Sequence, residues 1–246
     1  MAAPCDKRRV GDNQRGLHPD HRAAFKVDFA RFERGVGVNP YLVADVLALG
    51  ARLFCGATVR VAEETLLDAH SAGQQRVYLA NHSSHLDFIV IWAALPTPLR
   101  RVTRPVAAHD YWSKTALRRY LATQVYRAIL IEREHVSAAN NPIEQMIAAM
   151  GEEFSLILFP EGTRGRGGEV GEFKSGIYHL AHHRPGLKCV PVYLENLNRI
   201  LPKGEVLPLP LLSSVSLGTP MQLQDGEKKS AFLLRLREAV SALKSE

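Results

Sequence analysis

Residues 154–164 read FSLILFPEGTR, an apolar run that ends at Pro160 and passes into small and charged residues. A short apolar run bounded by turn signals predicts a buried strand, here over residues 154–159. In the loop that follows, Gly162 permits a tight turn, and Arg164 offers a fork of N–H donors that suits a phosphate group. The stretch therefore predicts a strand with an anion-binding loop at its carboxyl end. A flexible loop with solvated arginines is the alternative interpretation.

Further apolar segments alternate with helical patterns on both sides of this strand. The predicted strands cover residues 76–80, 101–108, 125–132, 187–194 and 211–220, and the predicted helices cover residues 88–95, 110–124, 142–153 and the last twenty residues from 227. Pro105 favours an edge position or a strand end for its segment, because proline has no N–H to donate. Strands that alternate with helices of this length predict an α/β fold, a single domain with a mostly parallel central sheet flanked by helices.

A second polar stretch, NHSSHLD at residues 81–87, directly follows the strand predicted at 76–80. Ligands of open α/β sheets collect at the carboxyl ends of the strands, so this stretch and the Arg164 loop are both expected at a site there. If His82 lies in the turn before a helix and Asp87 in its first turns, the carboxylate can accept from one imidazole nitrogen. The other nitrogen is then free to act as a base on an alcohol that attacks a carbonyl.

Two other interpretations of residues 81–87 stay open at this point. In the first, His82 or His85 caps a helix, helped by Ser83 or Ser84. In the second, His82, His85 and Asp87 bind a metal ion, since all three are ligand types. No further cluster of His, Asp or Glu stands at a supporting spacing, and the metal interpretation is therefore the weaker one.

The segment beyond Arg164 is rich in glycine, with Gly165, Gly167, Gly168 and Gly171. Residues 173–176 (FKSG) are expected to begin the next helix, where backbone N–H groups and the helix dipole favour an anion. No GxxxxGK[ST] motif is present, so a nucleotide P-loop is not supported.

The chain has 246 residues, and 31 Lys and Arg against 25 Asp and Glu leave a net charge of +6. This excess favours anionic partners, namely phosphate groups, acidic carrier proteins or an anionic membrane surface. No nucleic-acid reading module is recognisable, so nucleic acid is not an expected partner. The cysteines Cys5, Cys55 and Cys189 form no CxxC pair, which argues against a disulfide scaffold or a zinc finger.

The amino-terminal region divides into two parts. Residues 1–35 are expected to form a basic tail or helix, and their first twenty residues lack the apolar core of a secretory signal peptide. Residues 39–58 are apolar except for Asp45 and Arg52, which interrupt a membrane span. We expect a helix there that is either buried or lies in a membrane interface. Residues 36–246 are taken as one domain.

Together the two polar stretches resemble the glycerolipid acyltransferase family, which includes the 1-acyl-glycerol-3-phosphate acyltransferases. The resemblance spans about residues 70–220, and the matching motifs occur in the family's order. The four motifs correspond to Asn81, His82 and Asp87; to Leu130-Ile131-Glu132-Arg133; to residues 159–164 (FPEGTR); and to Val190-Pro191-Val192. Three positions depart from the usual pattern: Arg127 replaces a glycine, Gly165 replaces a serine, and Ala108-His109 stands near a missing lysine.

The resemblance implies an acyltransferase domain over residues 36–246 that moves a fatty acyl group from acyl-CoA or acyl carrier protein to a lysophospholipid hydroxyl. The expected acceptor is 1-acyl-sn-glycerol-3-phosphate, which gives phosphatidic acid. In this reading His82 deprotonates the hydroxyl and Asp87 orients the imidazole. The acceptor's phosphate is assigned to Arg133, Glu161, Gly162, Thr163 and Arg164, with Asn81 and Lys174 as additional candidates. Glu161 is assigned to organising the loop, because a free carboxylate would repel phosphate.

The resemblance further implies that the reaction needs neither a metal nor a cofactor, because the thioester supplies the driving force. The expected location is peripheral, on the cytoplasmic side of a membrane. The departures above leave other acceptors open: glycerol 3-phosphate, another lysophospholipid or a lyso amino acid lipid. A non-catalytic phospholipid-binding protein is the alternative from a different functional class.

Overall fold

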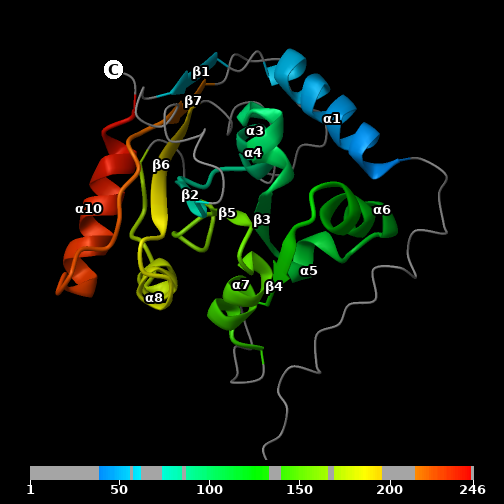
Figure 1. The fold of residues 1–246 in the computed structure, drawn as a ribbon. Coiled ribbons are helices and arrows are strands. Elements are labelled where there is room, and N and C mark those ends of the chain that lie inside the picture. The colour runs from blue at the N-terminus through cyan, green and yellow to red at the C-terminus, as the bar shows by residue number, and fades with distance from the viewer. Residues whose placement is uncertain are drawn as a thin grey trace, which may run out of the picture. The chain divides into compact units, whose positions relative to one another are not determined.

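A computed structural model describes residues 39–55, 58–61, 74–84, 87–132, 140–165, 169–195 and 214–244 (Figure 1). These residues form a seven-stranded sheet in the order β1-β7-β6-β2-β5-β3-β4. All neighbouring strands pair in parallel except β6 and β7, which are antiparallel. The predicted α/β fold with a mostly parallel sheet is therefore confirmed. The strands are β1 Thr58–Val61, β2 Arg76–Ala80, β3 Thr103–Ala108, β4 Ile129–Ile131, β5 Ser155–Leu158, β6 Lys188–Glu195 and β7 Ser214–Leu217.

Helices cover both faces of the sheet. The helices are α1 Pro40–Cys55, α3 Asp87–Ala94, α4 Thr97–Arg101, α5 His109–Trp112, α6 Ala116–Tyr120, the π-helix η3 Leu121–Val125, α7 Pro142–Met150, α8 Gly176–His183 and α10 Lys229–Ser241. Buried side chains of α1, α3 and η3 pack on one face, and those of α7, α8 and α10 pack on the other. Strand β2 contributes to both cores, because successive side chains of a strand point to opposite faces. All five of its residues are buried, as expected for a central parallel strand.

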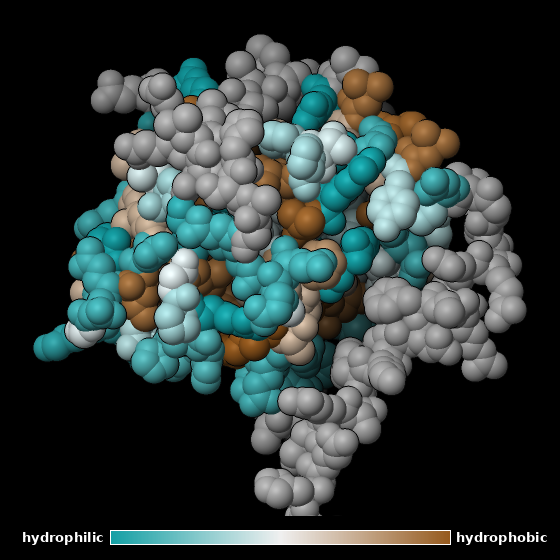
Figure 2. All heavy atoms as spheres, viewed as in Figure 1, coloured by the Kyte–Doolittle hydropathy of each residue, from teal (hydrophilic) through white to brown (hydrophobic). Residues whose placement is uncertain are grey.

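Helix α1 carries the two charged residues that interrupt the apolar segment 39–58, and both contact other parts of the domain. Asp45 accepts from an Arg100 guanidinium nitrogen at 2.6 Å, and Arg52 donates to the carbonyl oxygens of Ala93 and Leu95. Both charges thus fasten the helix to the domain. The same helix leaves large apolar side chains exposed at Tyr41, Leu42, Val46 and Leu49, and apolar residues are visible at the corresponding end of the surface in Figure 2. Among the residues that the structure describes, no helix combines the length and the apolar character needed to cross a membrane.

The helix predicted over residues 110–124 is interrupted at residues 113–115. The chain forms α5, then a turn, then α6 and η3, because the Thr115 hydroxyl accepts from the Arg118 N–H at 3.2 Å and starts a new helix. The strand predicted at 125–132 is shortened to Ile129–Ile131. Arg127 has a φ of 53°, which takes the chain out of η3 in a left-handed conformation before β4 begins.

Neither the edge position nor the strand end expected from Pro105 is observed, since Pro105 is the third of the six residues of β3. Strand β3 lies inside the sheet, between β5 and β4. Pro105 is registered with Ile157 of β5, whereas pairing with β4 begins one residue later, at Val106. The proline thus stands just before the point where a second neighbour would need its N–H.

Candidate active site

The chain turns after β2 and brings His82 beside the first residue of α3. There the His82 Nδ1 lies 2.8 Å from the Asp87 Oδ2. The Asp87 side chain is fully buried, and the His82 side chain is 16% exposed. Because a carboxylate only accepts hydrogen bonds, Nδ1 is the donor in this contact, and in the neutral imidazole Nε2 then carries the lone pair. The structure therefore brings the predicted base and its orienting acid together.

Asp87 also organises the loop that carries the histidine. Its Oδ2 accepts from the N–H groups of Ser83 at 2.6 Å and Ser84 at 2.8 Å. Backbone donors before a helix need such partners, and the helix dipole favours a negative charge at this end. The capping interpretation of residues 81–87 thus applies, but Asp87 is the accepting side chain in place of a histidine or serine.

One face of the His82 ring packs against Phe159. The two ring centroids are 4.3 Å apart, and the ring planes lie within 22° of each other. With Nδ1 held by Asp87 and one face held by Phe159, the ring has a fixed plane and a fixed direction for Nε2. Phe159 was not among the predicted site residues for this role, although its place as the last residue of the apolar run before Pro160 was a usable signal.

Glu161 joins the two predicted loops. Its Oε1 accepts from the His82 N–H at 3.0 Å, and the carboxylate also accepts from the Gly171 N–H. Next to it, the Gly165 N–H donates to the His82 carbonyl oxygen at 2.8 Å. Burial raises the pKa of Glu161 above its ordinary value, an effect opposed by the two backbone N–H groups. This arrangement fits the organising role assigned to Glu161, because the carboxylate faces protein N–H groups.

The end of the loop carries the candidate phosphate-binding groups. Gly162 has a φ of 72°, and a Cβ built there would lie 2.7 Å from the Lys174 Nζ, so the lysine side chain crosses directly over this glycine. Thr163 and Arg164 are exposed. In the described part of the chain no protein group pairs with the Arg164 guanidinium, which leaves its donors free for an anion. The geometry therefore brings Arg164, Lys174 and the turn at Gly162 into one loop structure.

The side-chain amide of Asn81 forms its hydrogen bonds with the neighbouring strand β6. Its Nδ2 donates to the Leu194 carbonyl oxygen at 3.0 Å, and its Oδ1 accepts from the Leu194 N–H at 2.8 Å. The amide thus ties the end of β2 to β6, as a positioning residue. Gly171 also has a structural role, because a Cβ at this position would lie only 2.7 Å from the Glu161 Oε2 and would collide with it.

Two predicted residues, Arg133 and His85, lie outside the described residues. The metal interpretation of His82, His85 and Asp87 can therefore be examined only in part. Within the described ranges no group of three His, Cys, Asp or Glu side chains is placed to hold a metal ion.

Replacing Glu161 by glutamine is expected to destabilise the fold by about 1–3 kcal/mol, because one of its two acceptor oxygens becomes an N–H₂ group that faces a backbone donor. Activity should fall as well, since the His82 loop loses its anchor. Glu169→Gln, an exposed carboxylate changed in the same way, is the matched control. Chemical denaturation of both variants gives the free energies of unfolding, and equal values would contradict the anchoring role.

Comparison with known protein families agrees with this geometry. The family model described as Acyltransferase matches residues 59–195, more than half of the chain. A relative from Limnanthes douglasii, named 1-acyl-sn-glycerol-3-phosphate acyltransferase, is 32% identical over 145 residues, which are 56% of this chain and 48% of the relative. The mouse protein 1-acyl-sn-glycerol-3-phosphate acyltransferase alpha is 30% identical over 176 residues, 70% of this chain and 57% of that protein. The chain spans about half the length of the curated relatives it matches.

The fold is also similar to a solved structure, the 1-acyl-sn-glycerophosphate acyltransferase from Thermotoga maritima. The TM-score is 0.63 over 82% of this chain and 77% of that one. Only 18% of the aligned residues are identical, so this likeness bears on the fold alone.

Proposed function

Because this chain belongs to the acyltransferase family, we propose that it transfers a fatty acyl group from a thioester to the free hydroxyl of 1-acyl-sn-glycerol-3-phosphate. The observation that carries the proposal is the His82–Asp87 contact of 2.8 Å, in a loop whose His82 carbonyl oxygen accepts from the Gly165 N–H, next to Arg164. A protein that only binds phospholipid has no use for an oriented base. The names of the relatives from Limnanthes douglasii and mouse support the choice of acceptor.

The chemistry follows from the neutral His82 imidazole, in which Nδ1 donates to Asp87 and Nε2 carries the lone pair. This nitrogen takes the proton of the acceptor hydroxyl while the oxygen attacks the thioester carbonyl carbon. The tetrahedral intermediate collapses with cleavage of the C–S bond, and the leaving thiolate receives the proton from the imidazolium. Asp87 stabilises the imidazolium in between, since its carboxylate already contacts Nδ1. The products are an ester and a free thiol, so the reaction needs no metal and no cofactor.

The acceptor's phosphate is assigned to the loop at the carboxyl end of β5. Arg164 offers a planar fork of donors and Lys174 a point charge, and both are exposed. The Gly162 turn keeps the backbone close to the lysine. Glu161 holds this loop against the His82 loop, which fixes the distance between the phosphate group and the base.

The proposal includes a peripheral position on the cytoplasmic side of a membrane, where the lipid acceptor and the donors acyl-CoA or acyl carrier protein meet. The exposed apolar side chains Leu42, Val46 and Leu49 of α1 support contact with a lipid surface. The net charge of +6 favours an anionic one.

The test is an acyl-transfer assay that follows the release of free thiol and identifies the lipid product by mass spectrometry. Acceptors would be 1-acyl-sn-glycerol-3-phosphate, glycerol 3-phosphate, other lysophospholipids and a lyso amino acid lipid, each with acyl-CoA and acyl carrier protein. The proposal expects phosphatidic acid from the first acceptor. Binding of lysophosphatidate without release of thiol would instead identify a non-catalytic phospholipid-binding protein.

Replacing Arg164 by alanine is expected to raise KM for 1-acyl-sn-glycerol-3-phosphate about 10–100-fold, since a hydrogen bond to a charged group contributes about 1.5–3 kcal/mol. The kcat should change less, because Arg164 is assigned to the phosphate group and takes no part in the proton transfer. Monoacylglycerol, which lacks the phosphate, serves as the second acceptor, and its kinetics should be unaffected. The control Arg119→Ala removes the same charge from an exposed site on α6. Equal losses with both acceptors would contradict the assignment.

A further inference from the structure

Four arginines lie near the amino ends of the central parallel strands, whereas His82 follows the carboxyl end of one of them. Arg100 and Arg101 end α4, Arg104 is the second residue of β3, and Arg127 stands two residues before β4. Strands β2, β5, β3 and β4 are all parallel, so the start of β3 and the approach to β4 lie at their amino ends. His82 follows the carboxyl end of β2. This cluster is therefore separate from the candidate active site.

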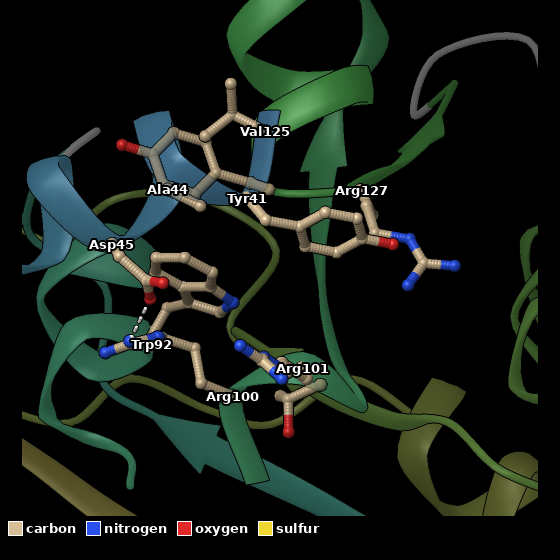
Figure 3. Close-up of a pocket in the computed structure, with 10 residues that line it drawn as sticks. Tyr41, Ala44, Asp45, Trp92, Arg100, Arg101, Val125 and Arg127 are labelled. Carbon is tan, nitrogen blue, oxygen red and sulfur yellow. Dashed lines mark hydrogen bonds and ion pairs between the residues drawn. The ribbon is translucent and has the colours of Figure 1, made fainter. Parts of the chain in front are cut away.

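The positive charge of this cluster is poorly balanced by the part of the chain that the structure describes. Arg100 is paired with Asp45 at 2.6 Å and lies over the Trp92 ring at 5.1 Å. By contrast, Arg101, Arg104 and Arg127 have no carboxylate partner among the described residues. In Figure 3 the Asp45–Arg100 pair lies at one end of a pocket and Arg127 at the other.

Two of these guanidinium groups lie near one aromatic ring, and the Arg104 Nη1 also donates to the Ala149 carbonyl oxygen at 3.1 Å. The Arg104 Cζ lies 3.5 Å from the centre of the Phe154 ring, and the Arg127 Cζ lies 5.0 Å from it. Burial lowers the pKa of Arg104 to about 10, and the nearby charge of Arg127 acts in the same direction. The Arg104 Nε is buried with no hydrogen-bond partner. Like charges held this close favour an anion beside them.

Besides the nearby charge of Arg104, the backbone conformation of Arg127 is itself unfavourable. With a φ of 53° it occupies the left-handed region, where a non-glycine residue is strained. A glycine would hold this turn without strain. The chain therefore keeps an arginine at a position whose backbone favours glycine, which indicates that the guanidinium itself has a use.

The pocket beside these residues is lined by aromatic rings, by three arginines and by Asp45, which is paired with Arg100. It lies between α1 and the amino ends of β3 and β4 (Figure 3). Tyr41, Trp92 and Tyr126 supply its aromatic lining, and Arg100, Arg101 and Arg127 supply its cations. Planar guanidinium groups match the oxygens of a phosphate in pairs, which a compact ammonium cannot do.

We propose that this pocket is a second phosphate-binding site, formed by Arg101 and Arg127 and separate from the site of acyl transfer. The phosphate belongs either to the head group of an anionic lipid or to a soluble phosphate compound. The lipid source would use the exposed Leu42 and Val46, which neighbour the pocket residues Tyr41 and Asp45 along α1. The site does not depend on the proposed function, because none of its residues takes part in the chemistry at His82.

Fluorescence offers a local test, because the chain has two tryptophans and one of them, Trp92, lines the pocket. In a Trp112→Phe background, titration with inorganic phosphate at constant ionic strength should change the Trp92 emission with saturation. Arg101→Ala and Arg127→Gly should each weaken this binding at least tenfold. Arg127→Gly is chosen because glycine accepts the left-handed backbone. Arg164→Ala and Arg119→Ala, which remove a charge elsewhere, should leave the binding unchanged.

Calorimetric titration in an Arg164→Ala background, alone and with Arg101→Ala, Arg127→Gly or Arg119→Ala added, is the second measurement and needs no Trp112 substitution. This background removes the guanidinium group that is assigned to the acceptor's phosphate. Vesicles of phosphatidylglycerol in phosphatidylcholine, against phosphatidylcholine alone, separate the two sources. Tighter binding to the anionic vesicles than to inorganic phosphate identifies a lipid head group, and the reverse order identifies a soluble compound. A phosphate response that is absent, or that is equal with and without Arg101→Ala or Arg127→Gly, would overturn the proposal. Loss of acyl transfer in other variants would not affect this result.

Discussion

Replacing His82 by alanine is expected to lower kcat for acyl transfer about 10²–10⁴-fold, the usual contribution of a positioned general base. The loss should appear in kcat more than in KM, because the imidazole acts on the hydroxyl proton and the Arg164 loop holds the phosphate. Thiol release and lipid product, measured at saturating concentrations of both substrates, give the value directly.

The fold should survive this substitution. His82 contributes one side-chain contact to Asp87 and a stacking contact to Phe159, whereas its backbone N–H and C=O bonds to the Arg164 loop remain in the variant. His183→Ala, an exposed histidine in the last turn of α8, is the matched control and should keep full activity. Undiminished turnover in His82→Ala would remove the proposed base.

The central strands were predictable because burial on both faces leaves a continuous apolar run. Strand β2 matches its predicted range of 76–80, and β5 differs from its predicted range by one residue at each end. The pair His82 and Asp87 was predictable for a related reason. An offset of five residues across a strand-to-helix turn has few geometries, and one of them brings a carboxylate to Nδ1.

Other features depend on contacts between segments that are far apart in the sequence. The position of β3 inside the sheet follows from its pairing with β5 and β4, whereas Pro105 alone indicated an edge. The break between α5 and α6 depends on Thr115 as a new cap, a signal that the apolar pattern of 110–124 concealed. The stacking of Phe159 on His82 joins the ends of two strands, and the sequence marks Phe159 only as the last residue of an apolar run before Pro160.

Arg127 shows how one residue can be identified from the sequence and explained only by the structure. The motif comparison marked it as a departure from a usual glycine. Its φ of 53° now supplies the reason that glycine is usual there. The same conformation directs the arginine toward Phe154 and the pocket near α1.

Asp87 has two roles, and two substitutions should separate them. In Asp87→Asn the amide oxygen can take the place of Oδ2 and still accept from Ser83, Ser84 and the His82 Nδ1–H. The fold and the ring direction should therefore persist, with unfolding free energy within about 1 kcal/mol of wild type. What disappears is the negative charge that stabilises the imidazolium. The kcat should thus fall about 10²–10⁴-fold, as expected when the acid of a His–Asp pair is neutralised.

Asp87→Ala removes the acceptor as well as the charge. Two backbone N–H groups before α3 then lose their partner in a buried place, at about 1–3 kcal/mol each. Denaturation should accordingly show a loss of about 2–6 kcal/mol in the alanine variant and little in the asparagine variant, while both lose activity. Asp225→Asn, an exposed aspartate outside the site, controls for the change in net charge. If the asparagine variant kept wild-type kcat, the charge of Asp87 would have no part in catalysis, and its role would be limited to capping the helix and fixing the His82 ring.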